Sequence, residues 1–160
     1  MSMFDTTAMT VSELTADNPA ATAALIRAKT FDMSQAAECA VLAPKEEGAW
    51  SHELRAALAA RIARMNGDLV LSAHYGAGAG DLAVLADPNA EITSSELAPV
   101  VAFMDKVALQ TGQVESRDVT ALQDANISDA DIVRLAELNA FISYQVRVIA
   151  GLRLLNGTGQ

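Results

Sequence analysis

The C-terminal part of the chain, residues 128–155, constrains the fold more than any other segment. Ser128 is a typical helix N-cap residue. Apolar residues then recur at spacings of three and four, which places them on one side of a helix. They are Leu135, Leu138, Ile142, Val146, Ile149 and Leu152. The pattern predicts one long helix that ends near Leu155.

A second amphipathic helix is predicted after Ser51, which is a suitable N-cap. Arg55, Arg61 and Arg64 lie largely off its apolar side. Gly67 breaks the helix, and a further helix continues through His74. The buried stripe of the first helix consists of Trp50, Leu54, Leu58, Ile62 and Met65.

Shorter helices are indicated on either side of this pair. Asn18 and Pro19 suit the start of an alanine-rich helix, and a helix over residues 31–41 ends before Pro44. The capping-box pattern Thr-Ser-Ser-Glu at residues 93–96 introduces a helix that Gly112 ends. A short helix covers residues 116–124, after which Asn126 adopts the left-handed conformation. Residues 76–92 form the loosest interior region.

Composition agrees with an all-helical protein. Hydrophobic residues make up 51% of the 160 residues, aromatic residues only 4%, and alanine is abundant, whereas strands favour aromatic and β-branched residues. We therefore expect an all-α helical bundle with a flexible N-terminal arm (1–17), an N-terminal helical extension (18–49) and a main helical domain (50–160).

The charge balance limits the possible partners. The net charge is −9, and the 11 Lys and Arg residues are scattered along the chain, so neither nucleic acid nor a membrane surface is expected to bind. No secretory signal or apolar run long enough to span a bilayer is found. Cys39 is the only cysteine, which excludes an intrachain disulfide and suits a reducing compartment. We expect a cytoplasmic protein.

Several local patterns suggest chemistry but have simpler explanations. The glycines of "GAGAG" follow a predicted helix, whereas a phosphate loop needs a preceding strand. His52 and His74 match no recognised metal-ligand spacing, so neither a metal nor a cofactor is predicted. Cys39 is expected to act as a small hydrophobic residue. By itself, His74 fits a hydrogen-bonded core histidine.

The stretch "LRAALAARIARMNGDLVLSAHY" resembles the AhpD-like, carboxymuconolactone decarboxylase family, whose members read like "RELVILRVARLNGCxYCxxxH". The match includes Arg55, Arg61, Ala63, Arg64, Asn66 and Gly67. Residues 97–155 resemble the second half of the same family, and the N-terminal third resembles the helical extension of its peroxidase-related members. The resemblance implies an AhpD-like helical bundle that assembles as a homo-oligomer, from dimer to hexamer.

The resemblance also shows which catalytic residues of the family this chain lacks. Hydroperoxidase members of the family use a Cys-x-x-Cys pair with a glutamate and a histidine. In this chain the glutamate position falls on Ala56, and the two cysteine positions fall on Asp68 and Leu71. The histidine position falls on Tyr75, one residue after His74. Peroxide reduction by a dithiol is therefore excluded at this site.

Two classes of function remain open. In the first, the chain is an enzyme like the decarboxylase members, which act on lactone acids by acid–base chemistry. The catalytic candidates are then His74, Tyr75 and Asp68, with Asp68 or His74 as base and Tyr75 as proton donor. The alternative for Asp68 is a helix N-cap without a catalytic role. In the second class, the chain is a non-catalytic homo-oligomer that binds a small molecule or serves a structural purpose.

Overall fold

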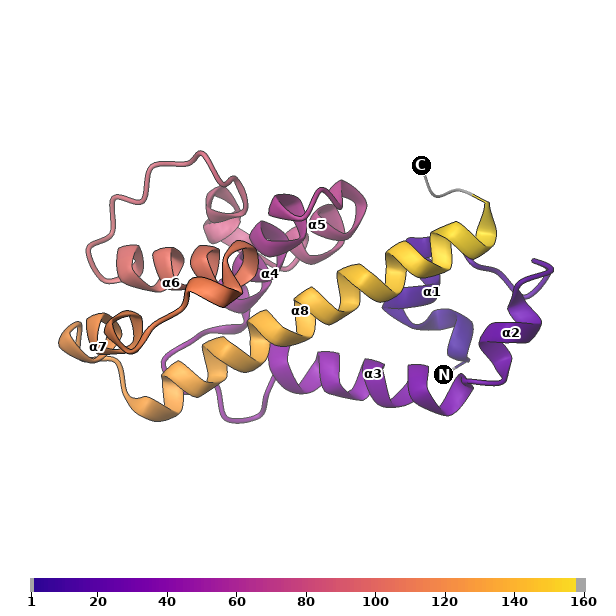
Figure 1. The fold of residues 1–160 in the computed structure, drawn as a ribbon, viewed down its shortest axis with the longest axis horizontal. Helices are drawn as coiled ribbons and strands as arrows, with labels where there is room; N and C mark the ends of the chain where they lie inside the picture. The colour runs from indigo at the N-terminus through magenta and orange to yellow at the C-terminus, as the bar shows by residue number, and fades with distance from the viewer. Residues whose placement is uncertain (1, 158–160) are drawn as a thin grey trace.

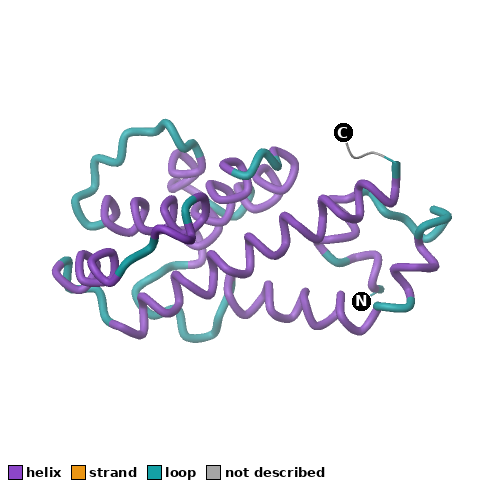
Figure 2. The backbone as a smooth tube through the Cα atoms, in the orientation of Figure 1, coloured by secondary structure: helices purple, strands orange, loops and turns teal. Residues whose placement is uncertain are grey.

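The computed structural model describes residues 2–157, and all of their regular elements are helices (Figures 1 and 2). The predicted all-α class is confirmed. Residue 1 of the predicted arm and residues 158–160 of the predicted main domain lie outside the described residues. Within the described part, no helix is both long and apolar enough to cross a membrane.

The elements follow one another along the chain as eight α-helices and three short 3₁₀ helices. They are η1 (Met3–Asp5), α1 (Thr7–Ser12), α2 (Ala21–Leu25), α3 (Ala28–Leu42), α4 (His52–Met65), α5 (Leu69–Gly76), η2 (Gly80–Ala86), α6 (Leu97–Leu109), η3 (Thr111–Gln113), α7 (Ser116–Asp124) and α8 (Asp129–Asn156).

Helix α8 is the central element of the molecule. It crosses the whole length of the bundle and contacts α1 and α3 from the N-terminal third of the chain as well as α4 and α6 from its middle (Figure 1). The core lies where α4, α6 and α8 meet, and Leu58, Ile62, Met104, Leu138 and Ile142 are fully buried there. Each such side chain stabilises the fold by roughly 1.5–3 kcal/mol.

Signals in the local sequence predict most helix ends correctly. The Ser51 and Ser128 hydroxyls accept hydrogen bonds from the backbone of the first turns of α4 and α8. Helix α7 spans the predicted residues, and Asn126 has the expected positive φ of 62°. A cap depends only on residues a few positions away, so neighbouring sequence is enough to identify it.

Two arginines that lie largely off the predicted apolar side of α4 are nevertheless buried. Arg55 and Arg61 are only 2% and 3% exposed. The Arg55 guanidinium donates to the carbonyl oxygens of Trp50, Val41 and Glu47. Burial, followed by repulsion from Arg134, lowers the pKa of Arg55.

Arg61 is buried for a similar reason. Its guanidinium pairs with both carboxylate oxygens of Asp105 at 2.7 and 2.8 Å. It also donates to the carbonyl oxygens of Leu85, Asp87 and Pro88. The partners of both arginines are therefore largely loop carbonyls that the spacing of residues within α4 does not reveal.

Residues 3–12 also differ from the flexible arm that the sequence predicts. They form η1 and α1, and Met3, Met9 and Val11 are buried. Although the segment is rich in threonine, it also contains enough apolar residues for α1 to pack against α8. The side chain of Asn156 ties the same segment to the end of α8 by donating to the carbonyl oxygens of Ser12 and Glu13.

The region predicted to be loosest is partly ordered as well. Residues 80–86 form η2, and Leu85 is buried against the core. The capping box expected at residues 93–96 is not formed, because helix α6 begins only at Leu97. The Leu97 backbone N–H donates to the Ser94 hydroxyl instead. A long loop therefore connects η2 to α6 (Figure 2).

Candidate functional site

A buried carboxylate joins four helices. Glu38 is 5% exposed and is the only buried residue of α3. Its Oε1 accepts a hydrogen bond from the Thr7 hydroxyl of α1 at 2.6 Å. Its Oε2 accepts bonds from the Tyr75 hydroxyl of α5 at 3.3 Å and from Nε2 of Gln145 of α8 at 2.9 Å. We call Thr7, Glu38, Tyr75 and Gln145 the Glu38 cluster.

Thr7 is the link between this cluster and the molecular surface. Its backbone N–H donates to the Gln35 side chain at 2.7 Å, which fixes the first turn of α1 against α3. Its hydroxyl lies 3.4 Å from Nε2 of His74. A hydroxyl has one proton, and Thr7 gives it to the Glu38 carboxylate. Thr7 is therefore left as an acceptor, and its contact with His74 is a hydrogen bond when the imidazole proton is on Nε2.

His74 is the exposed member of the arrangement. It stands at the C-terminal part of α5, and its ring meets the Tyr75 ring edge-on at a centroid distance of 5.3 Å. With the proton on Nε2, the lone pair of Nδ1 is available to a molecule in solvent. The Glu38 carboxylate, the Thr7 hydroxyl and the His74 imidazole thus form a chain. In this chain Glu38 orients Thr7, and Thr7 in turn orients His74 as a potential base.

Tyr75 remains a phenol in this environment. It is 4% exposed. Burial, followed by the charge of Glu38 and the hydrogen bond to it, raises the pKa of Tyr75 far above its ordinary value. A phenol with a raised pKa is a weak proton donor to substrate, so the Tyr75 hydroxyl serves to hold the Glu38 carboxylate.

Asp68 has a different set of partners. One of its oxygens accepts a hydrogen bond from the Leu71 backbone N–H at 3.0 Å, which caps α5 as the N-cap alternative predicts. Both oxygens pair with the Arg153 guanidinium of α8, at 2.8 and 3.0 Å. Arg153 also donates to the Val11 carbonyl oxygen, so this buried ion pair links α1, α5 and α8.

The structure therefore brings two of the three sequence-predicted site residues to one place. His74 and Tyr75 meet the Glu38 cluster, whereas the side chain of Asp68 bonds to Arg153 and to the Leu71 backbone. Sequence reasoning missed Thr7, Glu38 and Gln145, which come from segments far from the predicted site. One signal could have identified Glu38, since it is an acidic residue flanked by Ala36, Ala37 and Ala40 in an otherwise apolar stretch.

The cluster contains one buried atom without a partner. Gln145 is 2% exposed, and its Nε2 donates to Glu38. Its Oε1 is buried and accepts no hydrogen bond from a described residue. Such an atom costs free energy. The arrangement of donors around Glu38 is therefore fixed at some expense to stability.

No pair of thiols lies near this site. Cys39 follows Glu38 in α3 but is exposed to solvent. Leu71, at one of the two aligned thiol positions, is fully buried in the core. Among residues 2–157, no group of three or more His, Cys, Asp or Glu side chains is placed to hold a metal ion.

Five surface cavities of about 270 to 400 Å³ lie elsewhere on the molecule. None of these five is lined by His74, Tyr75 or Asp68. The His74 imidazole is therefore reached from the open surface of α5, whereas the groups behind it are closed off from solvent.

Comparison of the chain with protein-family models, curated proteins and solved structures finds no match in any of the three.

Proposed function

We propose that the protein is a thiol-independent acid–base catalyst of the AhpD-like, carboxymuconolactone decarboxylase type, with His74 as general base. The observation that carries the proposal is the Thr7 hydroxyl, which bridges the Glu38 carboxylate and Nε2 of His74. The single cysteine supports this assignment over dithiol peroxide reduction, and the all-helical fold agrees with the family as a whole. By resemblance, the substrate class is a small lactone acid.

The chemistry assigned to the chain is proton transfer before and after the loss of CO₂. Nδ1 of His74 takes the proton of the substrate's carboxyl group, and the imidazole becomes an imidazolium. The bond between the carboxylate and the lactone ring then breaks, CO₂ leaves, and the electron pair of that bond passes to the lactone carbonyl as an enolate. The imidazolium returns its proton to the enolate carbon. Nε2–H continues to donate to Thr7, and the Glu38 carboxylate behind that hydroxyl stabilises the positive charge. Tyr75 and Gln145 hold Glu38 in position. Asp68, occupied by Arg153, has the structural role of capping α5.

The experiment measures CO₂ release from small γ-lactone carboxylic acids by the purified protein. We expect His74→Ala to reduce the rate by roughly 10²- to 10⁴-fold, the usual contribution of a general base. Thr7→Val keeps the shape of the side chain but removes its hydroxyl, and it should lower the rate through the orientation of His74. His52→Ala is the matched control, because His52 is exposed on α4 and bonds only to the Pro44 carbonyl and Glu47.

Two results would oppose the proposal. The first is turnover that survives in His74→Ala at the wild-type rate. The second is consumption of hydroperoxide that Cys39→Ser abolishes, since this would assign the activity to the one thiol and not to the imidazole.

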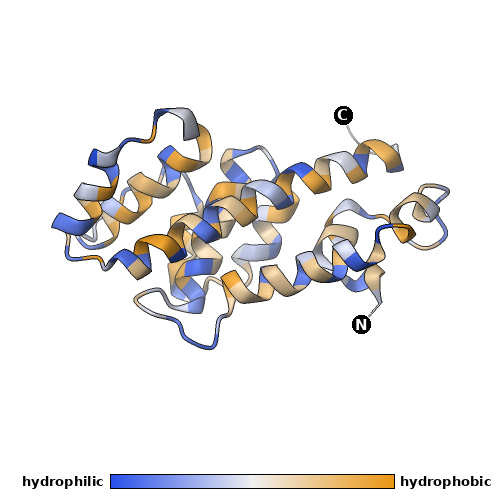
Figure 3. Ribbon diagram, turned by 60° about the horizontal axis from the view of Figure 1, so that its bottom comes forward, coloured by the Kyte–Doolittle hydropathy of each residue, from blue (hydrophilic) through white to orange (hydrophobic). Residues whose placement is uncertain are grey.

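A second candidate function is a non-catalytic homo-oligomer, from dimer to hexamer, that retains a small molecule. Apolar side chains that are exposed to solvent in the single chain favour this oligomer. Ile26 is 81% exposed, Met33 62%, Leu154 70% and Leu155 60%. Figure 3 shows apolar residues along α3 and at the C-terminal end of α8. In either case we place the protein in the cytoplasm, where the exposed Cys39 thiol stays reduced.

Light scattering separates the oligomer from a single chain. An assembly should give a mass that is a multiple of 16.8 kDa, and Leu154→Glu together with Leu155→Glu should reduce it to one chain. A 16.8 kDa species at all concentrations up to about 100 μM would contradict assembly.

A further inference from the structure

A second polar site lies between α6, η3 and α8. It is a cavity of about 270 Å³ lined by Val107, Thr111, Ala136, Asn139, Ala140, Ser143 and Arg147. The five positions that α8 contributes follow one another at spacings of one, three or four residues and lie on one face of the helix. Gln145, which contacts Glu38, is two residues from both Ser143 and Arg147 and points to the opposite face. The cavity is thus separate from the Glu38 cluster.

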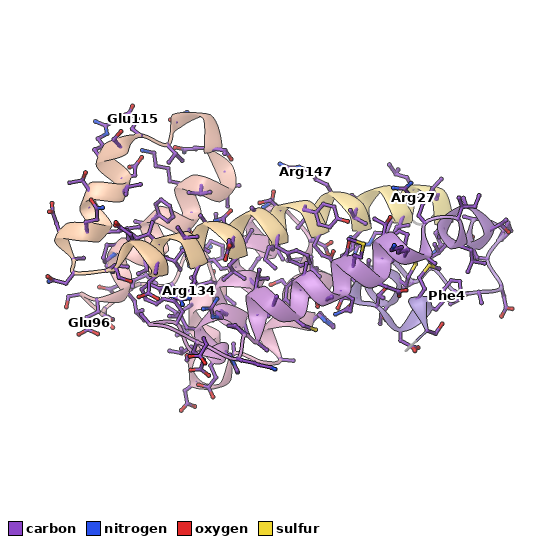
Figure 4. All side chains as sticks on the ribbon, turned by 90° about the horizontal axis from the view of Figure 1, so that it is seen from below. Phe4, Arg27, Glu96, Glu115, Arg134 and Arg147 are labelled. Carbon is purple, nitrogen blue, oxygen red and sulfur yellow. The ribbon has the colours of Figure 1, made fainter. Side chains whose placement is uncertain are left out.

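Arg147 gives this cavity a positive charge that the protein does not neutralise. It forms no ion pair or hydrogen bond with another described residue, whereas Arg61 and Arg134 pair with aspartates. Figure 4 shows Arg147 projecting from α8 on the side where Glu115, between η3 and α7, also lies.

The other polar groups complete a defined pattern of donors and acceptors. The Ser143 hydroxyl has no described partner and can donate. The Thr111 hydroxyl gives its proton to the Val107 carbonyl oxygen at 2.6 Å, which leaves Thr111 as an acceptor. Nδ2 of Asn139 donates to the Met104 carbonyl oxygen at 2.8 Å and also lies 3.7 Å from the Met104 sulfur, so Oδ1 is the free atom of that amide.

We propose that this cavity binds a short hydroxycarboxylate. The guanidinium of Arg147 and the Ser143 hydroxyl hold the carboxylate. Oδ1 of Asn139 and the Thr111 oxygen accept the proton of the ligand's hydroxyl. Val107, Ala136 and Ala140 contact its carbon chain, and the two alanines leave the space that the ligand fills. No acidic side chain lines the cavity, so an ammonium group in place of the hydroxyl would be buried without an opposite charge.

The test measures binding of three probes that differ in one group: 3-hydroxybutyrate, butyrate and 3-aminobutyrate. We follow the backbone amide signals of Ser143 and Thr111 by NMR during titration at constant ionic strength. A ligand of this size should bind 3-hydroxybutyrate with a Kd on the order of 1 mM. Butyrate and 3-aminobutyrate should both bind several-fold more weakly.

Variants assign the binding to individual side chains. Arg147→Gln should weaken binding by roughly 10- to 100-fold, as expected for the loss of hydrogen bonds to a charged group. Arg147→Lys should retain part of the affinity. Arg64→Gln is the matched control, because it removes one exposed positive charge from α4 and should leave binding unchanged. Binding should also persist in His74→Ala, since that residue belongs to the other site.

Any of three results would overturn the proposal. If 3-hydroxybutyrate binds wild type and Arg147→Gln with equal affinity, Arg147 does not bind the carboxylate of the ligand. Equal losses in Arg147→Gln and Arg64→Gln would show attraction to the overall charge only. Butyrate or 3-aminobutyrate binding as tightly as 3-hydroxybutyrate would show that the cavity does not recognise a hydroxyl.

Discussion

Replacement of Glu38 by alanine tests whether one carboxylate organises the packing of the N-terminal third against the main domain. Glu38 is the shared acceptor for the Thr7 and Tyr75 hydroxyls and the Gln145 amide. All three donors are buried. In Glu38→Ala the Thr7 hydroxyl can turn toward His74, but the other two donors lose their only described acceptor.

The expected cost follows from these contacts. A buried donor without a partner costs about 1–3 kcal/mol, and the removed side chain leaves a cavity, so Glu38→Ala should lose about 3–6 kcal/mol. Glu38→Gln should cost less, about 1–2 kcal/mol. Its amide oxygen still accepts from Thr7, and its NH₂ can donate to Gln145 if that amide turns its Oε1 inward. The Tyr75 hydroxyl is then the group left without an acceptor.

Urea unfolding of the wild type and both variants measures these differences. Glu137→Ala, at an exposed position of α8, is the control and should change the free energy of unfolding by less than about 0.5 kcal/mol. The reasoning is refuted if Glu38→Ala stays within about 1 kcal/mol of the wild type, or if Glu38→Gln costs as much as Glu38→Ala.

Three further predictions concern the supports of the fold. Arg61→Lys should lose about 3 kcal/mol or more in urea unfolding, because one ammonium cannot replace five hydrogen bonds; a loss below about 1 kcal/mol would contradict this. Gly48→Ala should lose about 2 kcal/mol, because φ is +66° and a Cβ would overlap Oδ1 of Asp131; a melting temperature equal to that of the wild type argues against it. The hydrogen bond from Ser128 is the largest cause that lowers the pKa of Asp131. The folded-state pKa therefore lies below the unfolded one, and the stabilisation present at neutral pH is lost as the pH falls from about 4 through the lower folded-state pKa. Asp131→Asn should flatten this decline in urea unfolding, whereas parallel curves for variant and wild type would show that Asp131 does not cause it.

The parts of the fold that were predictable depend on neighbouring residues. The caps at Ser51, Asp68 and Ser128, and the left-handed Asn126, follow from side chains that bond to backbone within the same turn. The burial of Arg55 and Arg61 was not predictable in this way. Their partners are carbonyl groups up to 27 positions away along the chain and, for Arg61, the Asp105 carboxylate 44 positions away, and helix periodicity contains no information about them.

The residues of the candidate site also differ in whether local sequence could identify them. His74 and Tyr75 could be found because they follow a recognisable stretch in α5. Glu38 and Thr7 could not, since only the tertiary packing of α1 and α3 brings them to α5 and α8. Ala56, where the family resemblance leads us to expect a glutamate, has no carboxylate, and the buried carboxylate that bonds to Tyr75 is Glu38 of α3.

The central claim is that Glu38, through Thr7, sets the tautomer of His74 and leaves Nδ1 as the base. Nitrogen-15 NMR of the His74 ring measures this directly at a pH where the ring is neutral. The account predicts that the proton resides on Nε2 in the wild type and that Thr7→Val produces a mixture of both tautomers. A proton on Nδ1 in the wild type, or a tautomer that Thr7→Val leaves unchanged, would contradict it.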